Sequence, residues 1–146
     1  IGLSCLLVVA STAAQFGIPD VKRSLIAGAG GLFRLPASIA RNVAMELALT
    51  GDPISAERAF GIGLVNEICE PGEVVAAALD LARRITVNAP IAVRESRKVL
   101  LESQGVSDEE GWQITRDHFR VVLKTEDFQE GPLAFVEKRP PVWKGR

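Results

Sequence analysis

The sequence from residue 14 to residue 36 reads Ala14-Gln-Phe-Gly-Ile-Pro-Asp-Val-Lys-Arg-Ser-Leu-Ile-Ala-Gly-Ala-Gly-Gly-Leu-Phe-Arg-Leu-Pro36. It places one acidic residue, Asp20, just after a turn, and a glycine-rich turn, Gly28-Ala29-Gly30-Gly31, eight residues later. Backbone N–H groups at such a turn can hold a water or an oxyanion. A carboxylate next to them can act as an acid or a base. The stretch therefore predicts a site that handles a polar reacting group.

Each half of this pattern also has a simpler interpretation. An Asp that follows Pro often satisfies backbone N–H groups of its own turn, and a run of glycines can serve only as a flexible turn. The segment is not a Walker A loop, because no Lys-Ser/Thr follows, and its spacing differs from the GxGxxG fingerprint. From the residues alone, both interpretations stay open.

Composition narrows the class of protein. The chain has 146 residues, enough for one domain with a core. Its hydrophobic fraction of 47% and charged fraction of 24% are ordinary for a globular protein. The net charge is −1, and the only aromatic residues are six Phe and two Trp. We therefore expect neither a nucleic-acid partner nor a membrane-surface partner.

The chain has two cysteines, Cys5 and Cys69, and one histidine, His118. They form no CxxC motif or Cys/His cluster, so we expect no zinc or other metal site. A disulfide between the cysteines stays open, although two buried thiols in a reducing cytoplasm is the favoured interpretation. His118 falls mid-helix among charged residues and is interpreted as a surface or capping residue, not a catalytic one.

Residues 1–14 are apolar and end in small side chains, as in the hydrophobic region of a signal peptide. A positively charged region and an initiator Met are missing, and the run is too short to span a bilayer. We therefore interpret Leu6–Ala10 as a strand covered on both faces. A small secreted protein is the alternative.

The rest of the chain predicts a short strand near residues 15–17, with no evident sheet partner for it or for the first strand. A helix over about 38–50 is opened by Pro36, and a helix over 56–60 is capped by Ser55. A strand over 64–68 is followed by four helices, over 73–87, 91–102, about 107–124 (with Ser107 as its cap), and from Thr125 onward. The candidate core of the third of these comprises Trp112, Phe119, Val122 and Leu123.

Five segments, in order, resemble the enoyl-CoA hydratase/isomerase (crotonase) family. The family patterns are AQFGxPE, GAGGTxRLPR, AMEMxLTG, xAxxAxxxGLVN and EGxxAFxEKR. The matching segments of this chain are Ala14–Asp20, Gly28–Pro36, Ala44–Gly51, Ser55–Asn66 and Glu130–Arg139. Each motif is modest alone, but five in register extend over nearly the whole chain.

The resemblance implies an α/β fold: the C-terminal part of a crotonase-like ββα spiral with a helical C-terminal trimerisation region. Residues 1–68 would form the end of the spiral core, and residues 69–146 the helical region. The chain begins at Ile1, and its only methionine is Met45. We therefore expect it to correspond to the C-terminal half of a family member, with one family glutamate falling just before Ile1.

The resemblance also implies the chemistry, which is addition of water to a 2-enoyl-CoA thioester in fatty-acid metabolism. Asp20 matches the second of two family glutamates, and Gly28 matches the position whose N–H helps to hold the water. Phe135 and Lys138 match positions that contact the CoA nucleotide. The implied ligand is an acyl-CoA thioester, with no cofactor and no metal, in a cytoplasmic homotrimer or hexamer.

Two departures from the family pattern leave other interpretations of function open. Asp20 replaces Glu, which withdraws the carboxylate by about 1.5 Å, and a misplacement of about 1 Å can cost ~100-fold in rate. Leu6 stands where the family usually has Asp. The alternatives are an enoyl-CoA isomerase and a catalytically inactive fragment or interaction partner of intact family members. We expect this chain alone to be inactive.

Overall fold

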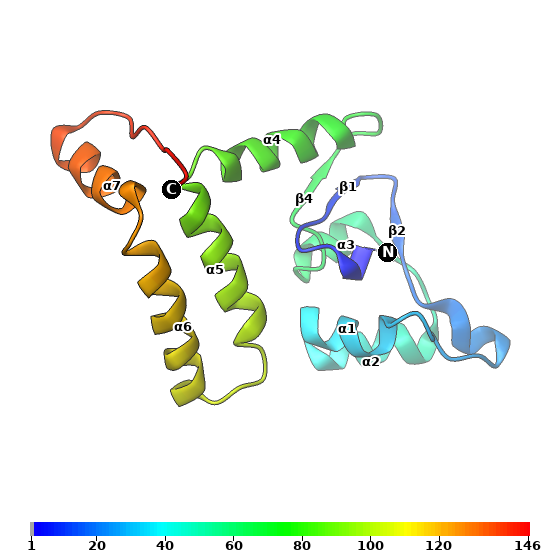
Figure 1. The fold of residues 1–146 in the computed structure, drawn as a ribbon. Coiled ribbons are helices and arrows are strands. Elements are labelled where there is room, and N and C mark those ends of the chain that lie inside the picture. Colours follow the sequence, from blue (N-terminus) through cyan, green and yellow to red (C-terminus); the bar gives the residue numbers. More distant parts are fainter. Residues whose placement is uncertain (1) are drawn as a thin grey trace. The chain divides into compact units, whose positions relative to one another are not determined.

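The protein is described by a computed structural model that covers residues 2–146 (Figure 1). The chain forms two compact units, one up to Leu81 and one from Ala82 to Arg146, and each is described by itself. The expected boundary after residue 68 stays a prediction.

Two small sheets organise the first unit. Strand β1 (Val9–Ser11) pairs in parallel with β4 (Glu67–Cys69), and β2 (Gln15–Phe16) pairs antiparallel with β3 (Ile54–Ser55). The predicted strands therefore do have partners, which come from the distal end of the same unit. The helical segments between and beside them are η1 (Gly2–Ser4), η2 (Pro19–Arg23), α1 (Gly31–Ser38), α2 (Arg41–Thr50) and α3 (Ala56–Gly61).

The first strand is shorter and less covered than predicted. It begins at Val9, and Leu6 and Leu7 are 56% and 43% exposed. The expectation of a strand over Leu6–Ala10 that is buried on both faces is therefore wrong. The physical reason is that β1 has a single neighbour, β4, within the described residues. Only Ala10 of this segment lies in the core.

Pro36 does not open a helix, as the sequence predicted, but lies inside α1. Because proline has no N–H to donate, it weakens the helix around it, and α1 ends two residues later at Ser38. A separate helix, α2, then begins at Arg41. Leu35, only 3% exposed, anchors α1 in the core, and this burial favours the helix through the proline.

The core of the first unit is built from small and aliphatic side chains. Ala56 and Ala59 of α3 are fully buried, which allows this helix to approach the strands closely. The clustered buried residues are Ala10, Leu35, Ile39, Ala44, Leu47, Ile54, Ala59 and Val65. They come from strands and helices far apart in sequence, so this core fixes the tertiary arrangement of the unit.

Four helices follow: α4 (Val74–Thr86), which crosses the division between the units, α5 (Pro90–Glu102), α6 (Asp108–Val122) and α7 (Glu126–Glu137). Helices α5 and α6 pack side by side (Figure 1). The predicted caps are confirmed at Ser55 and Ser107, whose hydroxyls accept hydrogen bonds from backbone N–H groups three residues later. Thr125 caps α7 in the same way.

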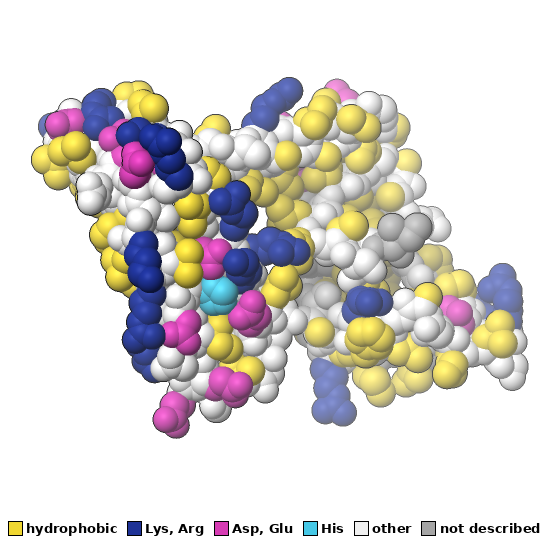
Figure 2. Space-filling view, viewed as in Figure 1, with side chains coloured by type: hydrophobic (Ala, Val, Ile, Leu, Met, Phe, Trp, Pro, Cys, Tyr) yellow, Lys and Arg dark blue, Asp and Glu magenta, His cyan; other side chains and the backbone are white. Residues whose placement is uncertain are grey.

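The predicted core of α6 is largely exposed. Trp112, Phe119 and Leu123 are 64%, 53% and 43% exposed, and Val122 is half-buried. Figure 2 shows such hydrophobic side chains at the surface of the helices. The expectation was wrong because α5 covers one side of α6 only. The cysteines also differ from the expectation of two buried thiols: Cys5 is exposed, Cys69 is half-buried, and no disulfide joins them.

The segment after α7 is held against that helix by hydrogen bonds. The buried carboxylate of Asp127 accepts hydrogen bonds from the backbone N–H groups of Lys144 and Gly145, at 2.7 and 2.9 Å. Glu130 accepts two hydrogen bonds from the Arg139 guanidinium and a third from the Val142 N–H. The Arg139 guanidinium first, and then the Val142 N–H, lower the pKa of Glu130 to about 2.

We predict that Leu47→Ala lowers the free energy of unfolding by about 2–5 kcal/mol, because Leu47 is 3% exposed in the core and its truncation leaves a cavity. Leu49→Ala is the matched control on the same helix. Leu49 is 67% exposed, so its truncation should change stability by less than about 0.5 kcal/mol. Urea unfolding followed by circular dichroism measures both. Equal losses from the two variants would contradict the described core.

We predict that Glu130 stabilises the fold above pH 4.5, the ordinary value of its carboxyl, and that this contribution is lost as the pH falls toward 2. The sign follows because the folded pKa lies below the unfolded one. The unfolding free energies of wild type and Glu130→Gln should therefore differ at pH 6, and the difference should shrink as the pH falls toward 2. Glu73→Gln, an exposed position in the first unit, should show no such convergence. A wild-type to Glu130→Gln difference that does not change with pH would refute the contribution.

Candidate functional site

The structure brings Asp20 and the glycine turn to one cavity of about 230 Å³. Asp20 comes from η2, and Gly28 from the turn that leads into α1. Ser4 and Arg34 line the same cavity. Residues that the sequence separates by eight positions thus face a common space.

The carboxylate of Asp20 is available for chemistry. Its residue is half-buried, and within residues 2–146 its side chain makes no hydrogen bond or ion pair. The backbone of the turn is closed instead by main-chain groups: the Asp20 carbonyl accepts from the Leu25 N–H at 3.2 Å, and Ser24 adopts a left-handed conformation with φ 56°. Asp20 therefore does not perform the local capping role that was the simpler interpretation.

Gly30 is required by geometry. Its φ is +87°, and a Cβ at this position would lie 2.0 Å from Nη1 of Arg34. The Arg34 guanidinium donates to the Ala29 carbonyl at 3.3 Å and lies 4.7 Å over the Phe33 ring. The turn is thus held in one shape by a side chain from the first turn of the helix that follows it. By contrast, nothing lies within 4 Å of a Cβ built on Gly28.

An apolar cavity of about 190 Å³ adjoins the polar one. The two cavities share three lining residues, Leu3, Gly17 and Ile18. The other lining residues of the apolar cavity are Gly2, Val8, Phe16, Leu35, Leu47 and Leu64. The arrangement offers a polar compartment with a carboxylate beside a compartment suited to a hydrocarbon group.

The other two predicted site residues lie in the second unit. Phe135 of α7 is 84% exposed, and Lys138 ends that helix in a left-handed conformation with φ 54°. Asp20 and Gly28 belong to the first unit, whereas Phe135 and Lys138 belong to the second. Contact of Phe135 and Lys138 with the nucleotide of CoA therefore stays a prediction.

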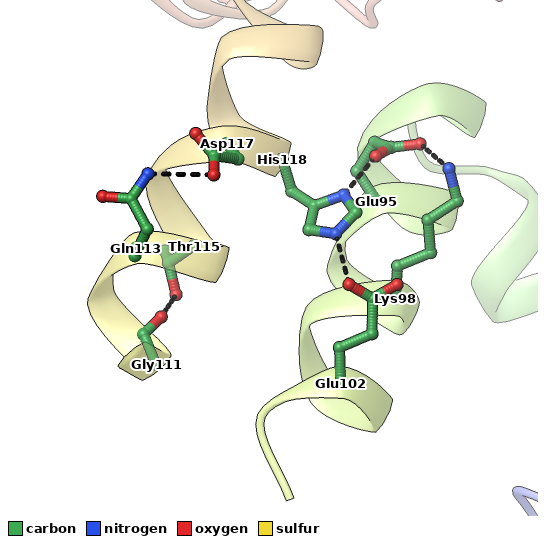
Figure 3. A network of polar contacts seen from close by, with 8 residues as sticks. All are labelled: Glu95, Lys98, Glu102, Gly111, Gln113, Thr115, Asp117 and His118. Atoms are coloured by element: carbon green, nitrogen blue, oxygen red, sulfur yellow. Dashed lines mark hydrogen bonds and ion pairs between the residues drawn. The ribbon is translucent and has the colours of Figure 1, made fainter. Parts of the chain in front are cut away.

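Sequence reasoning missed two features. Arg34 was not singled out in the sequence, although its position four residues after Gly30 on a helix predicts that it reaches back over the turn. His118 is not a surface residue: its side chain is 17% exposed and lies between Glu95 and Glu102 of α5 (Figure 3). The signal available was the spacing of those two glutamates, which places both on one face of a helix.

Residues 2–146 contain no group of three or more His, Cys, Asp or Glu side chains placed to hold a metal ion. Within the same residues, no helix combines the length and apolar character that crossing a membrane requires.

The sequence model of the enoyl-CoA hydratase/isomerase family matches residues 1–146. Enoyl-CoA hydratase EchA1 from Mycobacterium marinum has 46% identity and a TM-score of 0.93 over 99% of this chain. Enoyl-CoA hydratase from Bacillus anthracis has 35% identity and the same TM-score over 99%. Carnitinyl-CoA dehydratase of Salmonella arizonae is 34% identical over 99% of the chain.

The chain belongs to the enoyl-CoA hydratase/isomerase family. The predicted resemblance and the predicted crotonase-like α/β fold are confirmed. The chain spans 57%, 56% and 57% of the M. marinum, B. anthracis and S. arizonae proteins, respectively. This coverage agrees with the expectation that it corresponds to the C-terminal part of the family fold.

We predict that Gly30→Ala destabilises the protein by about 1–2 kcal/mol, the cost of a left-handed conformation for a residue with a Cβ, and displaces Arg34 from the turn. Gly28→Ala is the control, because its Cβ would meet open space. Thermal unfolding of the two variants makes the comparison. The description of the turn is wrong if Gly30→Ala is as stable as Gly28→Ala.

Proposed function

We propose that these residues supply the Asp20 and glycine-turn portion of a site that adds water to 2-enoyl-CoA thioesters. The observation that carries the proposal is the shared cavity of Asp20 and Gly28, directly beside an apolar cavity. Membership of the enoyl-CoA hydratase/isomerase family supports the choice of an acyl-CoA thioester as ligand.

The reaction adds the elements of water across the C2=C3 double bond. The water oxygen forms a bond to C3, and the electron pair of the double bond moves onto the thioester as an enolate. A proton then goes to C2, and the water gives up a proton to a carboxylate. Every atom comes from water and substrate, so the chemistry requires an acid–base group and stabilisation of the enolate, but no metal and no redox cofactor.

In this proposal, Asp20 is the acid–base group that this chain supplies. Its carboxylate has no competing partner within residues 2–146. The Gly28 N–H helps to hold the attacking water, because a glycine turn presents backbone donors with no side chain in the way. Arg34 keeps this turn in place through the Ala29 carbonyl. The shorter Asp, in place of the family's Glu, requires the substrate or water to lie closer to η2.

The apolar cavity is proposed to receive the hydrocarbon part of the acyl group. Its side chains, such as Phe16 and Leu64, offer only hydrophobic contact, and the lining residues that it shares with the polar cavity put the two compartments next to each other. Phe135 and Lys138 are proposed to contact the CoA nucleotide in a homotrimer or hexamer. The proposed setting is cytoplasmic fatty-acid metabolism.

The same chemistry run in reverse is a second candidate function. Carnitinyl-CoA dehydratases are similar to this chain at 34% identity over 99–100% of its length. Removal of water from a 3-hydroxyacyl-CoA uses the same carboxylate and the same enolate. The assay should therefore follow both directions.

We predict that, where this segment is joined to the remaining part of the family fold, Asp20→Asn lowers kcat for crotonyl-CoA hydration by about 100- to 10,000-fold, the range for loss of an acid–base group. The control is Asp52→Asn, an exposed Asp in the same unit whose carboxylate pairs with Lys22. Loss of enoyl-thioester absorbance measures turnover by the completed protein and by the 146-residue chain, and isothermal calorimetry measures binding of crotonyl-CoA.

Turnover that survives Asp20→Asn would remove Asp20 from the mechanism. Absence of both turnover and saturable crotonyl-CoA binding would contradict the proposed function. Binding without turnover would keep the ligand class and refute catalysis by this chain on its own, which is the outcome that the incomplete coverage of relatives leads us to expect.

A further inference from the structure

His118 lies between two carboxylates that both come from the neighbouring helix. On α6, its Nδ1 is 2.6 Å from Oε2 of Glu95, and its Nε2 is 3.0 Å from Oε2 of Glu102 (Figure 3). The side chain of Glu95 is only 8% exposed and that of His118 is 17% exposed. Glu102 is about half exposed, so the network runs from the interior of the helix pair to its surface.

The hydrogen-bond inventory fixes the protonation of this ring. An ionised carboxylate only accepts hydrogen bonds, and each ring nitrogen faces one. Both nitrogens must therefore carry a proton, and only the imidazolium satisfies both contacts. A neutral ring has one N–H, so its other nitrogen would turn a lone pair toward a carboxylate oxygen.

Charged neighbours support the same state. The ammonium of Lys98 donates to the other oxygen of Glu95 at 2.7 Å, which keeps that carboxyl ionised. Lys98 first, and then His118, lower the pKa of Glu95. The hydrogen bonds that the ring donates to Glu95 first and then to Glu102 raise the pKa of His118, against the opposing effect of partial burial.

No other titratable group within residues 2–146 bonds to the ring. On α5 the charged groups at this network are Glu95, Lys98 and Glu102. On α6 itself, the positions three and four residues from His118 carry uncharged side chains, namely Ile114, Thr115, Val121 and Val122. Asp117 next to it is engaged by Gln113 and Arg120. The charge state of the ring is thus set across the interface between the two helices.

We propose that His118 is a protonation-dependent clasp that holds α5 and α6 together: closed while the imidazolium bridges Glu95 and Glu102, and weakened when the ring loses its proton. This inference is independent of the proposed function. It concerns a different unit of the chain and none of the residues assigned to the reaction.

The direction of the pH dependence follows from the bridge. A histidine whose pKa is raised on folding stabilises the folded state fully below its unfolded value of about 6.5. That contribution is lost as the pH rises through the folded value. The α5–α6 pair should therefore loosen as the pH rises above about 6.5, not as it falls.

The clasp predicts a raised titration midpoint that can be assigned without ambiguity, because the chain has a single histidine. Proton NMR of the imidazole C–H signals in the 146-residue protein should give a midpoint above about 6.5. Glu102→Gln should lower the midpoint relative to wild type by removing one acceptor charge at an exposed position, where the fold tolerates the change. Glu95→Gln should lower it further.

Glu109→Gln is the matched control, an exposed glutamate of the same unit whose side chain makes no bond to the network. It should leave the midpoint unchanged. A wild-type midpoint at or below about 6.5, or a midpoint that Glu102→Gln does not lower, would overturn the proposal. Because Glu102 is exposed, the midpoint measured in Glu102→Gln tests the proposal even if Glu95→Gln fails to fold.

Hydrogen exchange gives a second readout that a purely structural histidine would not move. Amide protection across α5 and α6, corrected for intrinsic exchange, should decline in wild type as the pH passes through the NMR midpoint. His118→Gln should start lower and show no such step. A pH-independent protection in wild type would also overturn the clasp.

Discussion

Pairing between strands from opposite ends of the first unit is the constraint on which the candidate site depends. Because β1 pairs with β4 and β2 with β3, the intervening chain must leave the sheets and return to them. That path carries η2 and the glycine turn, and it folds them onto one cavity. Asp20 and Gly28 line the same cavity for this reason, although nothing in their eight-residue separation requires it.

The conformation of the glycine turn also depends on contacts within the turn and with the helix that follows it. Gly30 adopts a conformation that only glycine tolerates well, and Arg34 occupies the space that a side chain there would need. The same guanidinium caps the Ala29 carbonyl. A residue in the first turn of α1 therefore determines the shape of the turn before it, and the backbone donors proposed to hold water depend on a side chain outside the motif.

The second unit is stabilised in a different way from the first. Its helices expose many apolar side chains, and hydrogen bonds between charged groups connect its segments. Glu130 bonds to the chain after α7, and Glu95 and Glu102 bond to His118. Charge-assisted hydrogen bonds are stronger than neutral ones where water is partly excluded. Stability in this unit is accordingly tied to protonation, because the Glu130 carboxylate is neutralised in acid and the His118 imidazolium loses its proton as the pH rises.

Helix caps and helix bounds were largely predictable from the sequence, since they depend on neighbours within a few positions. The caps at Ser55 and Ser107 were predicted from hydroxyls placed before helical runs, and each hydroxyl accepts a hydrogen bond from the N–H three residues later. The helix bounds in the second unit agree to within about two residues for the same reason. The five ordered motifs also predicted the family, which the match over residues 1–146 confirms.

Contacts across the fold were decided by tertiary structure alone. Leu6 and Leu7 were predicted to be buried, yet burial requires a neighbouring strand or helix, and none in the described chain covers them. The partners of His118 lie 16 and 23 residues away on another helix, beyond any local pattern. By itself, then, the sequence determined the helices of the second unit, the caps at Ser55 and Ser107, and the family, because these depend on short-range bonding and motif order. Only the tertiary structure decided which side chains share a cavity or a charge network, because those contacts form when distant segments pack.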